Sequence, residues 1–370
     1  MGRLNKRLDP TLVGQEAEQL TNDLRKRVIG QDEALRSVVD AYQMNLAGLS
    51  TPGRPIGNFL FLGPTGTGKT RTVEALAESL VGDLRAVIKI DCAEFQHSHE
   101  IAKLIGSPPG YLGHRETHPL LSQEVLNQYH TDKIKVSFVL FDEIEKASDA
   151  LWNLLLGILD KATLTLGDNR RVDFQRAMIF MTSNLGAERM IKTKHLGFYS
   201  EDDFLQLKAK IGDIGMNAAR ARFKPEFMNR IDKVVVFQPL DEPTTRLIMK
   251  NELNTVQQRI FTSANAAPFV FQVTSSAEDF IMKHGYSLEY NARHLKRTIE
   301  RALVHPLSNL LATKQIQGGD LIRVEWEAGA ENLSFIKEAE AMPAYAMAQM
   351  VDASVSLPQK DKPSATSTKR

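Results

Sequence analysis

A glycine-rich segment near residue 65 carries residue types that bind phosphate. It fits the pattern G-x-x-x-x-G-K-[ST] in full, as Gly63-Pro64-Thr65-Gly66-Thr67-Gly68-Lys69-Thr70. Glycines let successive backbone N–H groups surround phosphate oxygens, and a helix that begins here adds partial positive charge. We predict an ATP-binding loop in which Lys69 reaches the β and γ phosphates and the Thr70 hydroxyl ligates Mg²⁺. The alternative is a glycine-rich turn that binds nothing.

Two acids follow a run of four apolar residues. Residues 138–141 are Phe-Val-Leu-Phe, and Asp142 and Glu143 come directly after them. A buried parallel strand would deliver both acids to the sheet edge where such folds bind ligands. Asp142 would then hold Mg²⁺ through water, and Glu143 would orient the attacking water. Alternatively, the two acids serve only to stabilise the first turn of the next helix, where acidic residues are favourable. Together with the glycine-rich loop they indicate ATP hydrolysis.

The elements that would position these residues show a regular alternation. Five short apolar runs have strand length, and residues at i, i+3, i+4 and i+7 spacing between them indicate helices. Strands of this kind alternating with helices predict an α/β fold with a five-stranded parallel sheet covered on both faces. The runs are residues 59–62, 87–90, 138–141, 178–181 and 234–237.

The sequence pattern changes after Pro239 from alternating strands and helices to a mainly helical pattern. We predict a partly helical lead-in or linker at 1–27 without a core of its own, a large α/β domain at 28–238, and a smaller, mainly helical domain at 239–330. The smaller domain has strand candidates at 269–273 and 321–324. From about Glu338 onward the chain is rich in Ala, Met, Ser, Pro and Lys and loses its periodicity, and we predict a disordered tail at 331–370.

Composition excludes several classes of protein. The chain has 370 residues, 46 Lys plus Arg against 45 Asp plus Glu, and a net charge of +1, which argues against a general polyanion binder. The single cysteine excludes an intramolecular disulfide, and no apolar run approaches the ~18 residues of a membrane span. Without an apolar signal core at its start, the chain is expected to be cytoplasmic. The histidines at 97, 99, 114 and 118 lack the ligand spacing of a zinc site.

Four segments together resemble the Clp-type AAA+ unfoldases, above all the second ATPase module of ClpA, ClpB and ClpC. The likeness runs from about residue 20 to 326, and it implies an AAA+ P-loop NTPase with a small lid domain. The motifs are Arg27-Val28-Ile29-Gly30-Gln31, Arg54-Pro55-Ile56-Gly57 before the glycine-rich loop, Asp142-Glu143-Ile144-Glu145-Lys146-Ala147 and Met181-Thr182-Ser183-Asn184-Leu185-Gly186.

The resemblance implies roles for further residues. Asn184 matches sensor 1, which contacts the γ phosphate or the lytic water, and Arg230 matches the arginine finger that reaches a neighbouring subunit. Arg293 matches sensor 2, although Asn291 replaces the usual Gly of that motif. Val28 and Ile29 would line the adenine pocket. A finger that acts in trans implies a ring, hexameric by family.

Two loops bear on substrates and partners. Gly110-Tyr111-Leu112-Gly113 matches the axial pore loop, in which Tyr111 and Leu112 would contact unfolded polypeptide, although the residues after it depart from the family pattern. Leu196-Gly197-Phe198 lies where ClpA, ClpC and ClpX carry a loop that docks on the peptidase ClpP, and which ClpB lacks. These motifs imply an unfoldase that threads polypeptide, with a ClpP-type peptidase as a partner if the docking loop is real.

Other interpretations stay open at this stage. The chain has no counterpart of a first ATPase module or a middle domain, so we expect a single-module form. A chaperone that remodels proteins without a peptidase fits the same motifs. A nucleic-acid motor on this scaffold is less compatible with the neutral charge, and a nucleotide-gated scaffold would bind ATP without hydrolysis.

Overall fold

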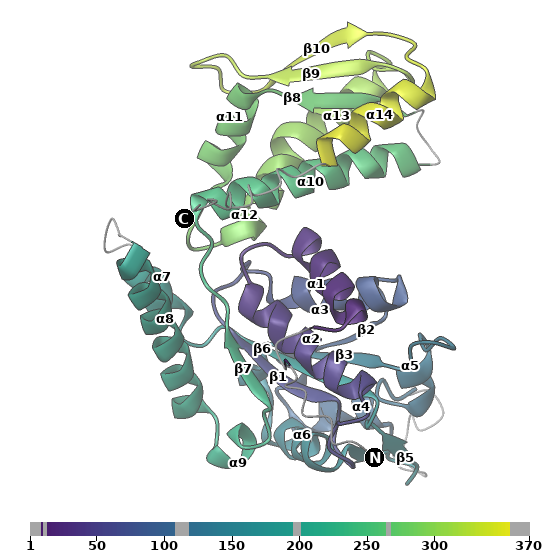
Figure 1. The fold of residues 1–370 in the computed structure, drawn as a ribbon, viewed down its shortest axis with the longest axis vertical. Coiled ribbons are helices and arrows are strands. Elements are labelled where there is room, and N and C mark those ends of the chain that lie inside the picture. The colour runs from purple at the N-terminus through teal and green to yellow at the C-terminus, as the bar shows by residue number, and fades with distance from the viewer. Residues whose placement is uncertain (1–8, 10–12, 108–117, 195–200, 264–267, 356–370) are drawn as a thin grey trace, which may run out of the picture. The chain divides into compact units, whose positions relative to one another are not determined.

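The computed structural model describes residues 9, 13–107, 118–194, 201–263 and 268–355 (Figure 1). The chain folds into two units. The first comprises Met1–Thr244 together with Leu288–Ala292, and the second comprises Thr245–Ser287 together with Arg293–Arg370. Each unit has hydrophobic clusters of its own.

A five-stranded parallel sheet forms the centre of the first unit. Its strand order is β2-β3-β6-β1-β7, and every neighbouring pair is parallel. Each of the five predicted apolar runs falls on one of these strands, so the prediction of an α/β fold with a five-stranded parallel sheet is confirmed. The strands are β1 Gly57–Leu62, β2 Val87–Asp91, β3 Ser137–Asp142, β6 Ala177–Ser183 and β7 Lys233–Val236.

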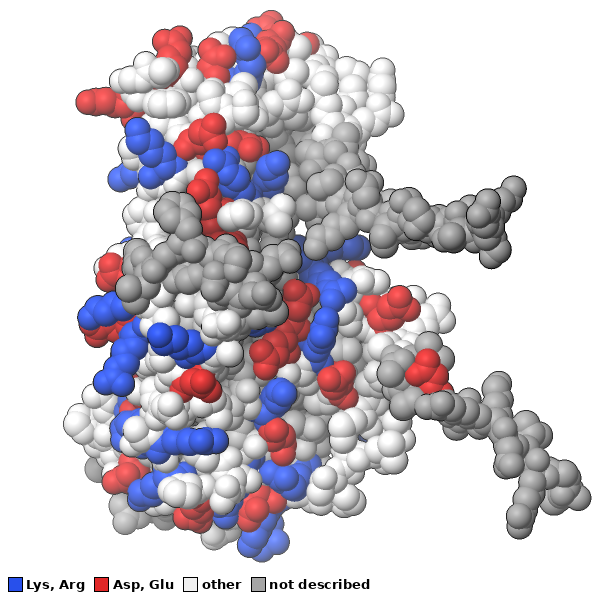
Figure 2. Space-filling view, turned by 60° about the vertical axis from the view of Figure 1, so that its left-hand side comes forward, with Lys and Arg blue, Asp and Glu red and all other residues white. Residues whose placement is uncertain are grey.

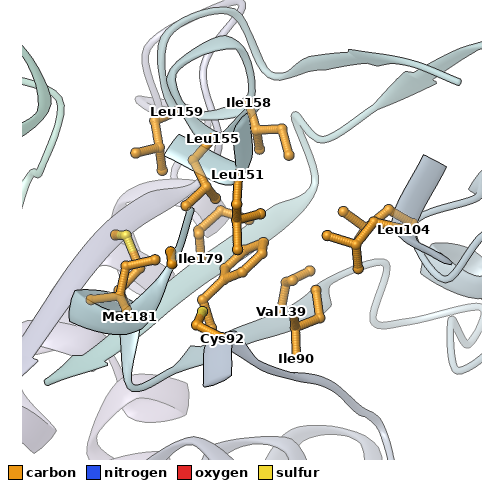
Figure 3. Packing of buried hydrophobic residues seen from close by; sticks show 14 of the residues in the cluster. Ile90, Cys92, Leu104, Val139, Leu151, Leu155, Ile158, Leu159, Ile179 and Met181 are labelled. Atoms are coloured by element: carbon orange, nitrogen blue, oxygen red, sulfur yellow. The ribbon is translucent and has the colours of Figure 1, made fainter. Parts of the chain in front are cut away.

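Alternate side chains of the sheet pack against different helices, because successive residues of a strand point to opposite faces. One face, with Phe59, Phe61 and Phe180, packs against α1 Gln15–Arg27, α2 Asp32–Leu46 and α3 Lys69–Val81. The other face, with Val139 and Ile179, packs against α6 Asp149–Lys161 (Figure 3). Both faces are therefore covered, as the apolar runs indicated.

Leu155 of α6 belongs to the cluster on this second face and is fully buried. We expect Leu155→Ala to lower the free energy of unfolding by about 2–5 kcal/mol, because it removes buried apolar contacts and leaves a cavity. Urea denaturation followed by circular dichroism measures this. Leu84→Ala is the control, because Leu84 is 41% exposed. Equal midpoints for the two variants would contradict the assignment of Leu155 to the core.

Helix α1 packs on the large domain. We predicted residues 1–27 as a partly helical lead-in without a core of its own, and Ala17, Leu20 and Leu24 of α1 are buried in the same cluster as α2 and α3. The leucines at helical spacing supply one apolar face, and that face packs on the large domain. The segment is part of the first unit rather than a separate lead-in.

The remaining elements of the first unit connect the sheet strands. The hairpin of β4 Thr163–Thr165 and β5 Arg171–Asp173 was not predicted, because three-residue strands give too short a pattern to detect. The helices and helical turns are η1 Cys92–Phe95, η2 Ser98–Ile101, α4 Ala102–Ile105, α5 Gln123–Asn127, η3 Ile144–Lys146, α7 Ala187–Lys194, α8 Glu201–Arg222 and α9 Pro225–Met228.

The second unit combines helices with a three-stranded sheet of order β10-β9-β8. Strands β8 Val270–Val273 and β9 Leu321–Glu325 pair in parallel and correspond to the two predicted strand candidates. The helices are α10 Glu242–Thr262, α11 Ser275–Gly285, α12 Asn291–Ile299, the π-helical η4 Glu300–Val304 and α13 His305–Ala312. The first residues of α10, up to Thr244, and of α12, up to Ala292, belong to the first unit.

Part of the predicted disordered tail is ordered. Strand β10 Ser334–Ala339 pairs antiparallel with β9, and α14 Ala344–Val355 follows it. Met347 and Val351 of this helix are buried against Val270 and Leu321. The Ala- and Met-rich composition, which suggested loss of structure, supplies the apolar face of a helix. Residues 356–370 lie outside the described part of the chain.

The surface carries mixed charge. Lys and Arg side chains lie interspersed with Asp and Glu on the face shown in Figure 2, in agreement with the net charge of +1. Within the described ranges, no helix combines the length and apolar character needed to cross a bilayer.

Candidate functional site

The glycine-rich loop turns from the end of β1 into α3 at the carboxyl edge of the sheet. Gly63 has φ +139°, and a Cβ at this position would lie 2.6 Å from the carbonyl oxygen of Phe237. Gly68, with φ +104°, immediately precedes α3. Glycine is required at both positions, because other residues rarely adopt such angles and would clash at the first. The loop therefore has the strand–loop–helix context that the motif predicts.

Lys69, the first residue of α3, is buried at 7% exposure. Its Nζ atom donates to the carbonyl oxygens of Gly63, at 2.7 Å, and Pro64, at 2.9 Å. It also donates to Oδ1 of Asn184 at 2.9 Å. These three hydrogen bonds hold the amine at the loop.

Asn184 connects this lysine to the predicted catalytic acid. The residue follows β6, and its Nδ2 atom donates to Oε1 of Glu143 at 3.3 Å while its Oδ1 atom accepts from Lys69. Its backbone N–H donates to Oε1 of Glu145 at 3.1 Å, which fixes the position of the loop end. Three residues predicted separately from sequence are therefore joined by hydrogen bonds at one edge of the sheet.

Asp142 and Glu143 lie at the end of β3, next to β6. The carboxylate of Asp142 accepts a short hydrogen bond from the Thr182 hydroxyl, and the same hydroxyl oxygen accepts from the Glu143 backbone N–H at 3.2 Å. Glu143 has φ +54°, a left-handed conformation that is uncommon for this residue type and turns the chain directly after the strand. Thr182 was not singled out by sequence, although it lies two residues before Asn184.

Lys146 forms an ion pair with Glu143, with Nζ 2.5 Å from Oε2. The hydrogen bond to Glu143, together with the charge of that carboxylate, raises the pKa of the Lys146 ammonium above its usual range. The group therefore stays charged at neutral pH. Glu143 is accordingly held from two sides, by the Asn184 amide and by the Lys146 ammonium.

The single cysteine also lies near these acids, but its thiol is unreactive. Cys92 is fully buried, and burial together with the negative charge of Asp142 raises the pKa of its thiol well above the usual range. The thiol stays protonated, so it is a poor nucleophile and a poor metal ligand. Within the described part of the chain, no group of three or more His, Cys, Asp and Glu side chains is arranged to hold a metal ion.

The predicted nucleotide-contacting residues lie around the loop. Thr70 is in the first turn of α3 and is partly exposed. Val28 is buried, and its Cγ1 atom would lie 3.9 Å from a Cβ built on Gly68, so it borders the loop. Ile29, the next residue, is partly exposed.

Arg230 lies away from these groups, at the opposite end of β1. Its carbonyl oxygen accepts from Nη2 of Arg54 at 3.2 Å and from Nδ2 of Asn58 at 3.1 Å, and Asn58 is near the start of β1. The six residues of β1 place its two ends roughly 16 Å apart. The Arg230 guanidinium donates to the Glu226 carbonyl oxygen at 2.6 Å and lies 3.7 Å from the Asp160 carboxylate. It is not joined to the glycine-rich loop of its own chain.

The other predicted site residues lie in the second unit or outside the described part of the chain. Arg293 lies on α12 in the second unit. Tyr111 and Leu112 of the predicted pore loop, and Leu196, Gly197 and Phe198 of the predicted docking loop, lie outside the described residues.

Comparisons with known families match both parts of the chain. A family model described as the AAA domain (Cdc48 subfamily) matches residues 54–234. A second model, described as the C-terminal, D2-small domain of ClpB protein, matches residues 240–324.

Curated relatives and solved structures agree with these matches. Chaperone protein ClpB of Bdellovibrio bacteriovorus is 40% identical over 321 residues, which are 87% of this chain and 35% of that protein. Heat shock protein 104 of Schizosaccharomyces pombe is 38% identical over 85% of this chain and 33% of its own length. A Saccharomyces cerevisiae Hsp104:casein complex in an extended conformation is similar with a TM-score of 0.73 and 30% identity, over 87% of this chain and 53% of that one.

The chain therefore spans about a third of the length of the curated relatives it matches. The two family models fall in chain order on its larger and smaller parts, and the resemblance inferred from the motifs is confirmed. This chain belongs to the Clp-type AAA+ ATPases and corresponds to the second ATPase module of ClpB.

Proposed function

We propose that this chain hydrolyses ATP in a ring and uses the energy to unfold and thread polypeptides without a partner peptidase. The observation that carries the hydrolysis step is the side chain of Asn184, which bonds Lys69 on one side and Glu143 on the other. A phosphate-binding cation and a water-orienting acid are thereby placed on either side of one polar residue. That arrangement suits phosphoryl transfer to water, which depends on positioning and on charge stabilisation.

The proposed roles follow from this geometry and from the family. Lys69 binds the β and γ phosphates, Glu143 orients and polarises the attacking water, and Asn184 contacts the γ phosphate or that water. Val28 and Ile29 contact the adenine ring. Arg293 contacts the γ phosphate from the smaller domain, and 28–238 and 239–330 together form the functional ATPase module.

The residues near the loop fit a magnesium ion. Mg²⁺ prefers oxygen ligands and is usually held by one or two protein groups together with substrate phosphates and water. Thr70 offers a hydroxyl oxygen and Asp142 a carboxylate, whose orientation is fixed by the Thr182 hydroxyl. When bound, the ion would neutralise charge that develops between the β and γ phosphates. We propose Thr70 as a direct ligand and Asp142 as a ligand through water.

The polypeptide substrate is proposed from the relatives. The matched ClpB relatives are named as chaperones, and the similar Hsp104 structure is a complex with casein. Tyr111 and Leu112 would contact such a substrate in the ring channel. The test is ATPase rate against protein concentration, with and without unfolded casein. A rate per subunit that rises with concentration and with casein supports the proposal, whereas stimulation by DNA and not by casein would favour a nucleic-acid motor.

The predicted ClpP-type partner is not supported by these comparisons, because the relatives are ClpB and Hsp104 proteins. We therefore expect that a ClpP-type peptidase added to this chain does not degrade an unfolded fluorescent reporter. The measurement follows loss of the intact reporter on a gel. Degradation that disappears when residues 196–198 are deleted would contradict this expectation and restore the docking-loop prediction.

A further inference from the structure

Two buried carboxamides outside the glycine-rich loop bond to its backbone. Gln31, 5% exposed, donates from Nε2 to the carbonyl oxygen of Thr67 at 3.1 Å. The same side chain also binds the segment after β7: it donates to the Gln238 carbonyl oxygen at 3.0 Å and accepts from the Gln238 backbone N–H at 3.2 Å. Gln31 therefore ties the loop to this segment.

Asn291 forms a second connection of the same kind. It is 2% exposed, and its Nδ2 atom donates to the carbonyl oxygen of Thr65 at 3.2 Å and to that of Leu288 at 3.1 Å. Its Oδ1 atom accepts from the backbone N–H of Leu240 at 3.0 Å. The next backbone N–H, that of Ala292, donates to the Gly66 carbonyl oxygen at 3.2 Å. All of these residues belong to the first unit.

The orientation of these carbonyls decides where the loop N–H groups point. In a planar trans peptide, the C=O of one residue and the N–H of the next point in opposite directions. Carbonyls of Thr65, Gly66 and Thr67 that accept bonds from outside therefore direct the N–H groups of Gly66, Thr67 and Gly68 the other way. Successive N–H groups directed to one side form the concave anion site of such loops.

Asn291 has φ +47°, a conformation that Gly and Asn tolerate better than other residues. The family commonly has Gly at this position of the sensor 2 motif. A Gly would adopt the same backbone but would lose the three side-chain hydrogen bonds to Thr65, Leu288 and Leu240. Asn thus keeps this backbone conformation and adds a contact to the loop that Gly cannot make.

We propose that Gln31 and Asn291 are positioning residues that hold the glycine-rich loop in its phosphate-binding conformation before the nucleotide arrives. A site ordered in advance loses less conformational entropy on binding, so its affinity is higher. This inference rests on the proposed nucleotide site. It assigns to these residues an effect on nucleotide affinity and none on the hydrolytic step itself.

The test is Asn291→Gly in the full chain. We expect ADP to bind about 10-fold more weakly by isothermal titration calorimetry, the size of effect that follows from the loss of hydrogen bonds to the loop. The KM for ATP should rise by a similar factor, while kcat at saturating ATP stays near that of the wild type. Asn169→Gly is the matched control, because Asn169 also has positive φ, at +66°, but is exposed in the turn between β4 and β5.

A second variant keeps the test decisive if the first one fails to fold. Gln31→Met retains length and burial but removes the donor to Thr67, and it should weaken ADP binding in the same direction. If both residues hold one loop, the double variant should lose less affinity than the product of the single losses. ADP affinity and KM that are unchanged in folded Asn291→Gly, or a loss in kcat alone, would overturn the inference. A wild-type chain that binds no ADP would instead contradict the proposed function.

Discussion

Replacing Glu143 with Gln should lower the rate of ATP hydrolysis by about 10²–10⁴-fold, the range for loss of a positioned general base. Glutamine keeps an oxygen that can accept from Nδ2 of Asn184, so the local structure should persist. It cannot accept a proton from water, and it loses the ion pair with Lys146. ATP binding should therefore remain while turnover stops. Phosphate release and binding of a fluorescent ATP analogue measure the two quantities separately.

Glu94→Gln is the control for this change, because Glu94 is an exposed acid in η1. It should leave both ATP binding and hydrolysis at the wild-type level. If Glu143→Gln hydrolysed ATP at the wild-type rate, Glu143 would not be the acid that orients water. If the wild-type chain bound ATP but did not hydrolyse it, the nucleotide-gated scaffold would be the better interpretation.

Replacing Arg230 with Ala should lower ATP hydrolysis by a similar or larger factor, since arginine fingers contribute roughly 10³–10⁵ in rate in GTPases. Nucleotide binding by the altered subunit should not change. Hydrogen bonds from Arg54 and Asn58 hold the Arg230 backbone at the amino end of β1, whereas the glycine-rich loop is at the carboxyl end. Steady-state phosphate release measures the loss. Arg36→Ala, at an exposed position of α2, is the control.

Mixing two inactive variants distinguishes action in trans from action in cis. Arg230→Ala retains the loop and Glu143, whereas Lys69→Ala retains Arg230. A mixed ring in which an intact site faces an intact finger should recover part of the ATPase activity. ATPase activity that first rises and then falls as the fraction of Lys69→Ala subunits increases would support the action of Arg230 in trans. A mixture as inactive as its components, with assembly verified by sedimentation, would count against it.

The parts of this protein that sequence predicted well are local ones. The glycine-rich loop occupies eight consecutive residues, and Asp142, Glu143 and Asn184 each follow a strand that its own apolar run identifies. Parallel strands bring their carboxyl ends to one edge. The contact between Lys69, Asn184 and Glu143 therefore followed from three short patterns and one general rule of topology.

The prediction of order was wrong where it rested on composition alone, because composition does not show which tertiary contacts a segment makes. Residues 334–355 have no strong period, yet β10 pairs with β9 and α14 buries Met347 and Val351. Helix α1 was predicted as a partly helical lead-in without a core of its own, and its leucines pack against α2. In both cases the apolar partner lies on another element, so the segment by itself did not indicate where it packs.

Sequence by itself determined the family and the strands that form the sheet, and it predicted the groups that would act on ATP, because each of these depends on residues close together along the chain. Only the tertiary structure decided what supports them. Asn291 lies 226 positions from Thr65, and Asn58 lies 172 positions from Arg230. No local pattern encodes such pairs. They arise because the loop and the finger segment both flank β1, and buried carbonyl groups there require hydrogen-bond donors.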